Sequence, residues 1–408
     1  MLRLNFLAIC LSSLAWFNVS LALVAAVPAQ KPASPEFVAV PIDGELFGGR
    51  LVKIESPWRI SLLNSERKTI GGLDLVSLRR KDQPQVLGVS GSQVLLANGD
   101  RIRATAHHAT QEVLRVNSEL LGDLEIPLER VRAVVLSAPP EPAGREKLLN
   151  GLLSNQRKQD VIILANGDEL KGSFLGLDDN TIRLDGPQGG VEINRNGVRA
   201  VALSSDLISF PMPKELYAKI LLADGSELAL LDGRLDGPNF RGQASIDREI
   251  TVPLEQLVGI EFRNGRLTYL SDLDHSEYRH TPYLGVRYPF ERDRTVTGNV
   301  LSLRGQIFRK GLGMHSRSEL TYRLNGQYRR FEAVVGIDDE TAGHGSVVFR
   351  VLRDGQPAWE SQPVTGQAAP QRVQLDVAGA RQMTLVVDFG ALGDVQDHAD
   401  WAEARLIR

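Results

Sequence analysis

The chain has 408 residues. This is too long for a single domain with one hydrophobic core, so roughly two to four domains are expected. It carries 47 Lys and Arg against 50 Asp and Glu, for a formal net charge of −3. The charges are nearly balanced, and the sequence contains no basic block. Both observations argue against nucleic-acid binding. The 38 glycines and 20 prolines are spread along the chain, and this favours many short strands joined by turns.

The N-terminus is typical of a targeting segment. Arg3 gives a short positive region, residues 4–26 are mostly apolar, and Val27-Pro28-Ala29 supplies small residues for cleavage. We expect residues 1–29 to be a signal peptide and the protein to be secreted, or periplasmic and in the cell envelope. The alternative is an uncleaved anchor, because the apolar run is about long enough to cross a bilayer. No membrane contact is expected beyond this leader.

The single cysteine, Cys10, lies inside this leader. The mature chain would therefore contain no disulfide, no thiol nucleophile and no cysteine metal site. Its folding has to rest on the burial of apolar side chains.

After a short linker, one pattern occurs three times. An apolar run is followed by Asn98-Gly99, by Asn166-Gly167 and by Asp224-Gly225. Such a pair between apolar runs predicts a β-hairpin with a type I′ turn. Each copy later ends in an apolar strand, which follows an apolar-charged phrase such as residues 126–131 or 252–257.

A degenerate first copy, from Ile42-Asp43-Gly44 to Val76-Ser77-Leu78, brings the number of repeat units to four. Each is expected to be a small antiparallel β meander that curls into a barrel-like sheet. Apolar residues at helical spacing predict a short amphipathic helix between units 2 and 3. The expected boundaries are 36–138 for units 1 and 2, 139–159 for the linker and helix, 160–206 for unit 3 and 214–265 for unit 4.

Neither the acidic turns nor His107-His108 is interpreted as a metal site. Each turn offers one or two carboxylates, which is too few for a calcium loop. Adjacent residues on a strand point to opposite faces, so the two histidines cannot face one ion. The repeats are instead expected to act as a spacer or as a contact surface for cell-envelope proteins.

The last third of the chain contains three informative phrases. They run over residues 310–316 (Lys-Gly-Leu-Gly-Met-His-Ser), 331–339 and 397–404, and each places polar or aromatic residues beside alternating apolar ones. Together they resemble the NPCBM/NEW2 family of carbohydrate-binding modules, over residues 267–408. The resemblance implies a galactose-binding-like β-sandwich of jelly-roll type whose partner is a carbohydrate, such as a cell-surface or matrix glycan.

The candidate residues lie at or near the ends of the strands that these phrases predict. His315 either bonds a sugar hydroxyl or fixes its own loop, and one of the two carboxylates after residue 337 is expected to cap the following loop. Trp401 is either the ring that stacks on a sugar or a core residue; Trp359 and Tyr283 are further candidate platforms. The expected carbohydrate-binding residues are His315, Asp338, Asp339, Asp397, His398 and Trp401.

The resemblance also implies a structural calcium ion near the chain ends. Glu403 in the last strand and Asp272 near the first would be its side-chain ligands. Calcium takes six to eight oxygens, so backbone carbonyls would supply the remainder.

These features predict an all-β, exported, non-catalytic glycan-binding protein. One alternative is a structural or scaffolding cell-envelope protein whose module binds protein. Another is a glycoside-processing enzyme, which requires two carboxylates across a cleft and predicts a deep pocket lined by such a pair within residues 36–265. No hydrolase elbow, metalloprotease helix or phosphate loop occurs in the sequence, so we expect no catalytic residue.

Overall fold

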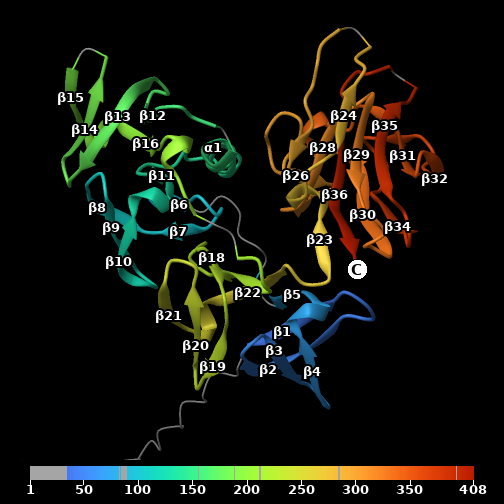
Figure 1. Cartoon of the computed structure of the whole chain (residues 1–408), viewed down its shortest axis with the longest axis horizontal. Coiled ribbons are helices and arrows are strands. Elements are labelled where there is room, and N and C mark those ends of the chain that lie inside the picture. Colours follow the sequence, from blue (N-terminus) through green and yellow to red (C-terminus); the bar gives the residue numbers. More distant parts are fainter. Residues whose placement is uncertain are drawn as a thin grey trace, which may run out of the picture. The chain divides into compact units, whose positions relative to one another are not determined.

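The computed structural model describes residues 35–81, 83, 90–154, 156–187, 189–210, 213–283, 285–391 and 393–408. The predicted leader, residues 1–29, lies outside them. In this part of the chain nearly all regular structure is β, with one α-helix, α1 (Pro142–Ser154), inside the segment expected to hold it (Figure 1). The predicted all-β class is confirmed. None of the helices in these described residues is long and apolar enough to span a membrane.

The N-terminal half consists of four units of five or six strands each. Unit 1 comprises β1 (Glu36–Pro41), β2 (Phe47–Glu55), β3 (Arg59–Leu63), β4 (Arg67–Gly71) and β5 (Leu75–Arg80). Unit 2 comprises β6 (Gln93–Leu96), β7 (Arg101–Arg103), β8 (Thr105–Ala109), β9 (Val113–Ser118), β10 (Gly122–Pro127) and β11 (Val131–Val135). Unit 3 comprises β12 (Asp160–Leu164), β13 (Glu169–Leu177), β14 (Thr181–Gly186), β15 (Gly189–Asn194) and β16 (Val198–Ala202). Unit 4 comprises β17 (Tyr217–Leu222), β18 (Glu227–Leu230), β19 (Arg234–Asp236), β20 (Asn239–Ala244), β21 (Arg248–Pro253) and β22 (Leu257–Arg263).

Each unit closes on itself. Its last strand pairs with its first, in β1–β5, β6–β11, β12–β16 and β17–β22. A 3₁₀ turn precedes every last strand, and the apolar-charged phrases at residues 126–131 and 252–257 contain two of these turns. The recurring phrase in the sequence therefore marks the point where each sheet turns back to close.

The hairpins use a different turn from the predicted type I′. In the first, Gly99 N–H donates to Leu96 O at 3.0 Å and Leu96 N–H donates to Asp100 O at 2.9 Å. Gly99 has a φ of +81°, whereas Asn98 does not have a positive φ, and a type I′ turn needs both. The Asn98 side chain instead accepts from Asp100 N–H at 3.0 Å. Because that bond stabilises an Asx turn, the loop is a type I turn followed by a left-handed glycine.

Strand pairing also joins the units to one another. The last strands β5 and β22 pair between units 1 and 4, and β11 and β16 pair between units 2 and 3. The expected series of units is thus joined edge to edge, because each last strand has two edges and both are used. Helix α1 packs on this sheet through Leu149 and Leu152, which contact Leu95 and Val135.

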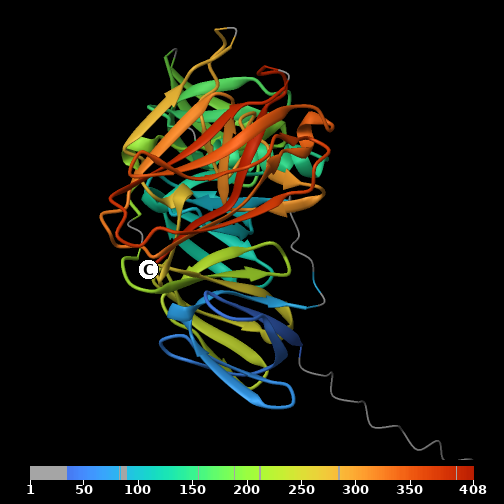
Figure 2. The ribbon, with the colours of Figure 1, turned by 90° about the vertical axis from the view of Figure 1, so that its right-hand side faces the viewer.

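The C-terminal domain is a sandwich of two antiparallel sheets, as predicted (Figures 1 and 2). One sheet has the order β25 (Glu291–Arg292), β28 (Gly311–His315), β36 (His398–Ile407), β30 (Arg330–Ile337) and β34 (Gln371–Asp376), with β23 (Leu267–Tyr269) on β36. The other has the order β24 (Glu277–His280), β29 (Ser318–Arg323), β35 (Gln382–Phe389), β31 (Ser346–Arg353) and β32 (Gln356–Glu360), with β33 (Val364–Thr365) on β31. Apolar side chains of both sheets, among them Trp401, Phe331 and Phe349, form one core between them.

A separate hairpin of β26 (Leu301–Leu303) and β27 (Gln306–Phe308) lies on the outer face of β36. In the same region Asp400 is 1% exposed, and no N–H or O–H of the described residues donates to either of its oxygens. Its partner is the buried carboxyl of Asp338. Burial first, and then the charge of Asp338, raise the pKa of Asp400 well above its usual range. Burial and the neighbouring carboxylate therefore favour the protonated form of Asp400 in the folded domain.

Asp400→Asn is expected to stabilise the domain at neutral and alkaline pH by about 1–2 kcal/mol. The folded carboxyl stays protonated while the unfolded one ionises above its usual pKa of 3.8, so wild-type stability falls as the pH rises. Asparagine is neutral at every pH and can donate to Asp338, so the gain should grow from pH 4 to pH 8 in urea-unfolding experiments. Asp274→Asn, at a fully exposed carboxylate, is the matched control. A loss of stability at pH 8 in the Asp400 variant would contradict the raised pKa of Asp400.

Candidate functional site

Seven strand ends meet at one end of the sandwich. Strands β24, β28, β30 and β35 finish there, and β29, β31 and β36 begin there, as shown by the pairs His280 with Ser318, His315 with His398, and Val347 with Phe389. The connecting loops cover residues 281–290, 316–317, 338–345 and 390–397. We call this set of loops the loop end.

Histidine rings fix the loop of residues 281–290. The His315 ring stacks on Tyr288 with centroids 4.1 Å apart. Its Nδ1 donates to the Ser316 carbonyl at 2.9 Å, and that carbonyl is also 3.2 Å from Nε2 of His280. Nδ1 of His280 accepts from the Tyr288 N–H at 3.2 Å. His315 is 3% exposed, and burial lowers its pKa, so it holds the loop as a neutral ring. Of the two roles considered for His315, the structure shows loop fixing.

Glu340 ties the start of β36 to the loop before the outer hairpin. It accepts from His398 Nδ1 at 2.6 Å, from Thr297 Oγ1 at 2.6 Å and from Asn299 Nδ2 at 2.7 Å. Burial alone raises the pKa of Glu340, but these hydrogen bonds outweigh it and lower the pKa to about 2. His398 is among the residues expected from the sequence, whereas Glu340 is not; its only signal is its place directly after Asp338-Asp339.

Asp338 and Asp339 both bind the protein itself. Buried Asp338 accepts from the N–H of Glu340 at 2.8 Å and of Ser302 at 2.7 Å, so it is the predicted cap. Asp339 accepts from Ser302 Oγ at 2.5 Å and from the N–H of Gly305 at 2.7 Å. The expectation that one of them is free for a polyol is corrected, because both anchor the outer hairpin.

Asp397 and Trp401 are also inaccessible, since both are 0% exposed. Asp397 accepts from Ser316 Oγ at 2.5 Å and from Ser346 N–H at 2.8 Å, and burial raises its pKa to about 6. Trp401 lies in the sandwich core, 5.2 Å from Phe349 between ring centroids. The interpretation of Trp401 as a stacking platform is corrected in favour of the core alternative.

The accessible aromatic ring of the loop end is Tyr283, which is 64% exposed. Its ring stands edge-on against Phe389 at 5.6 Å, and Gly393 lies beside it. Its N–H donates to Asp394 Oδ2 at 3.3 Å, and this bond ties the loop that contains Tyr283 to the loop of residues 390–397. Val286 and Val395, on these same loops, are 57% and 60% exposed. Trp359, the other candidate, is half-buried against Trp401.

The expected calcium ligands, Asp272 and Glu403, each lie beside a basic side chain. Asp272 Oδ1 is 2.6 Å from Lys310 Nζ, and Glu403 Oε2 is 3.2 Å from Arg405 Nη1. Both carboxylates are therefore neutralised by basic side chains, which compete with any cation. Among the described residues no group of three or more His, Cys, Asp or Glu side chains is arranged to hold a metal.

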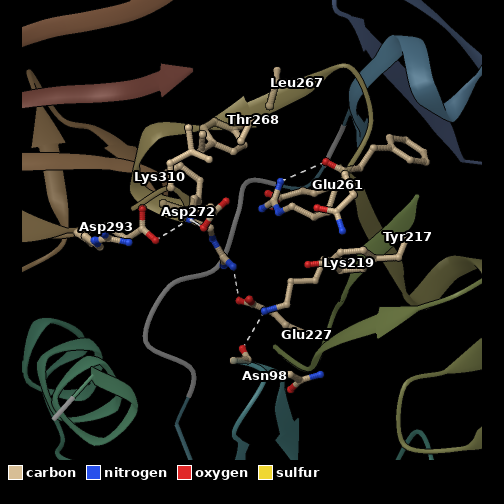
Figure 3. Close-up of a pocket in the computed structure, with 18 of the residues that line it drawn as sticks. Asn98, Tyr217, Lys219, Glu227, Glu261, Leu267, Thr268, Asp272, Asp293 and Lys310 are labelled. Carbon is tan, nitrogen blue, oxygen red and sulfur yellow. Dashed lines mark hydrogen bonds and ion pairs between the residues drawn. The ribbon is translucent and has the colours of Figure 1, made fainter. Parts of the chain in front are cut away.

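A cavity of about 930 Å³ lies among unit 4, the β23 segment and the outer hairpin (Figure 3). Ion pairs cross its wall: Glu261 with Arg263 at 2.6 Å, Asp272 and Asp293 with Lys310 at 2.6 Å each, and Glu227 with Arg309. Burial raises the pKa of Glu227, but the charges of Arg309, Arg101 and Lys219 lower it overall to about 2. Glu261 behaves in the same way beside Arg263, with a lowered pKa.

Residues 266–407 form an NPCBM/NEW2 domain, which confirms the resemblance seen in the sequence. The domain contains the whole loop end. The repeats before it lie outside this match.

Two relatives are similar to parts of this chain. A "Putative endo-alpha-N-acetylgalactosaminidase" of Renibacterium salmoninarum is 34% identical over 146 residues, which are 34% of this chain and 9% of that protein. An "Alpha-1,3-galactosidase B" of Akkermansia muciniphila is 32% identical over 115 residues, 27% of this chain and 14% of that protein. The chain thus spans a small part of the length of both.

Solved modules from Clostridium perfringens are similar as well. CBM51 of GH95, in complex with methyl-galactose, is 30% identical with a TM-score of 0.32, covering 34% of this chain and 99% of that chain. CBM51-2 with INT domains of ZmpB, in complex with GlcNAc, is 29% identical with a TM-score of 0.33, covering 42% of this chain and 36% of that chain.

Proposed function

We propose that this protein is an exported, non-catalytic glycan-binding protein whose loop end holds the sugar. The observation that carries the proposal is the exposed ring of Tyr283, fixed between two loops and adjacent to the Asp394 carboxylate. Sugars are bound by such a combination, because the ring covers their apolar face and the carboxylate accepts from hydroxyls. The NPCBM/NEW2 domain supports the ligand class. The names of the two relatives make galactose and N-acetylgalactosamine the first ligands to test.

The non-catalytic part of the proposal rests on the carboxylates of the cavity. A glycosidase needs one carboxyl group that stays protonated as the general acid. Glu227 and Glu261 instead have lowered pKa values, because arginines hold both as carboxylates. Asp397 and Asp400 have raised pKa values, but both are buried, at 0% and 1% exposed. We further propose that the joined repeat units carry the module and offer their surface to cell-envelope proteins.

Tyr283→Ala is expected to weaken binding of galactose or N-acetylgalactosamine about five- to tenfold, or ~1 kcal/mol, because it removes the stacking face. The measurement is a titration of the full chain followed by NMR or calorimetry. Tyr283→Phe should bind as the wild type does if stacking, rather than the hydroxyl, matters. Since Tyr283 is largely exposed, neither variant should change the melting temperature by more than a degree or two.

Leu231→Ala, at a residue 47% exposed on unit 4, is the matched control and should bind normally. Unchanged affinity in Tyr283→Ala would remove the loop end as the site. A well-folded wild type that binds no sugar, but binds envelope proteins, would favour the scaffolding alternative.

A further inference from the structure

The cavity in Figure 3 has a pronounced imbalance of charge. Its wall includes five acidic side chains: Glu146, Glu227, Glu261, Asp272 and Asp293. It also includes nine basic ones: Arg101, Lys214, Lys219, Arg263, Arg292, Arg294, Arg309, Lys310 and Arg408. Its volume, about 930 Å³, is within the range of small-molecule sites, which often lie where domains meet.

Every carboxylate of the wall already has a basic partner on the wall. Besides the three sets of ion pairs described above, Glu146 Oε2 is 3.2 Å from Arg101 Nη1. The cavity therefore has no free carboxylate with which to bind a cation or a row of sugar hydroxyls.

Several basic groups, by contrast, keep binding capacity. Lys219 Nζ donates to Gly99 O at 2.7 Å, and its nearest carboxylate, Asp100, is 3.7 Å away. The Lys219 charge also acts on Glu227, but the ion-pair partner of Glu227 is Arg309. Exposed Lys214 has no carboxylate within 4.0 Å among the described residues, and the nearest one to Arg292, on fully exposed Asp274, is 3.7 Å away.

We propose that this cavity binds an anionic ligand of up to disaccharide size, such as a sugar bearing a sulfate or a uronic acid carboxylate. Lys219 contacts the anionic group, and Lys214 attracts it at the exposed edge. Tyr217, Phe262, Tyr269 and Phe308 also line the wall, and the small accessible parts of these largely buried rings give the sugar ring an apolar neighbour. The site is separate from the loop end and does not depend on the function proposed for it.

The probes are a sulfated glucuronate disaccharide, inorganic sulfate and neutral galactose, titrated into the full chain by calorimetry at low and high NaCl. The disaccharide should bind, and more weakly at high salt, because its contacts are ionic. Lys219→Gln should weaken binding of the disaccharide at least fivefold. Lys214→Gln, at an exposed position, should weaken this binding with no change in melting temperature. Lys158→Gln, an exposed lysine outside the wall, should bind as wild type. Tyr283→Ala should bind the disaccharide normally, so failure at the loop end and failure here are distinguishable.

The proposal is overturned if the disaccharide gives no heat and no shift in melting temperature. It is equally overturned if Lys219→Gln and Lys214→Gln behave like Lys158→Gln, since binding would then be unspecific attraction. Sulfate that binds as tightly as the disaccharide would also overturn it, because the cavity would then recognise an anion without its sugar.

Discussion

Trp401→Ala is expected to lower the free energy of unfolding of the sandwich by about 3–5 kcal/mol. The indole is 0% exposed and lies between the sheets, with Phe349 edge-on at 5.2 Å and Phe331 at 6.2 Å. Removing it leaves a cavity that the two sheets cannot close without distorting their strand pairing. Since the indole Nε1 has no hydrogen-bond partner among the residues that the structure describes, the loss is one of packing alone. Urea unfolding of the full chain, followed by circular dichroism, measures it.

Trp401→Phe separates packing from any direct role in binding. Phenylalanine keeps an aromatic ring in the core, so this variant should lower the free energy of unfolding by well under half as much as Trp401→Ala does. Trp359→Ala changes a half-buried residue beside Trp401, so it should also lower the free energy of unfolding by less than Trp401→Ala does. A Trp401→Ala protein with wild-type stability and no sugar binding would show that the ring is a platform after all.

Glu340→Gln is expected to lower the stability at neutral pH by about 3 kcal/mol. The folded pKa of Glu340, about 2, lies below its usual 4.5, so the ionised form favours the folded state. This contribution is complete above pH 4.5 and is lost as the pH falls toward 2. The difference between wild type and variant should therefore shrink from pH 7 to pH 3. Unfolding curves at both values test the sign.

Glu277→Gln is the matched control, because it removes the same charge from a 60% exposed side chain of the same domain. It should change stability by a few tenths of a kcal/mol at either pH. If the loss in Glu340→Gln were the same at pH 3 as at pH 7, the hydrogen bonds from His398, Thr297 and Asn299 would not depend on its charge.

The repeats were predictable because their signals are local. An Asn-Gly or Asp-Gly pair between apolar runs marked the hairpins, and the phrase before the last strand marked the closure of each sheet. The turn type was wrong because the Asn98 side chain bonds the backbone, and this competes with the left-handed conformation that the prediction required. The pairing of β5 with β22 joins residues about 180 positions apart, and no local pattern encodes it.

The candidate site was only partly predictable, and β36 shows why. Residues 399–402 are all buried, because one face of the strand meets the core and the other lies under the outer hairpin. The alternation of apolar and polar residues that normally reveals an exposed face is therefore missing. A loop residue, Tyr283, carries the exposed ring instead.

The sequence by itself determined the all-β class, the series of β repeats with a helix among them, and the NPCBM-like module, which it placed at residues 267–408 and the family match places at 266–407. Those features depend on short-range propensities, or on phrases long enough to recognise. Tertiary structure alone decided which carboxylates are free, which aromatic ring is exposed and where the basic cavity lies. Its wall combines residues from Asn98 to Arg408, and accessibility and charge balance arise only when such distant segments meet.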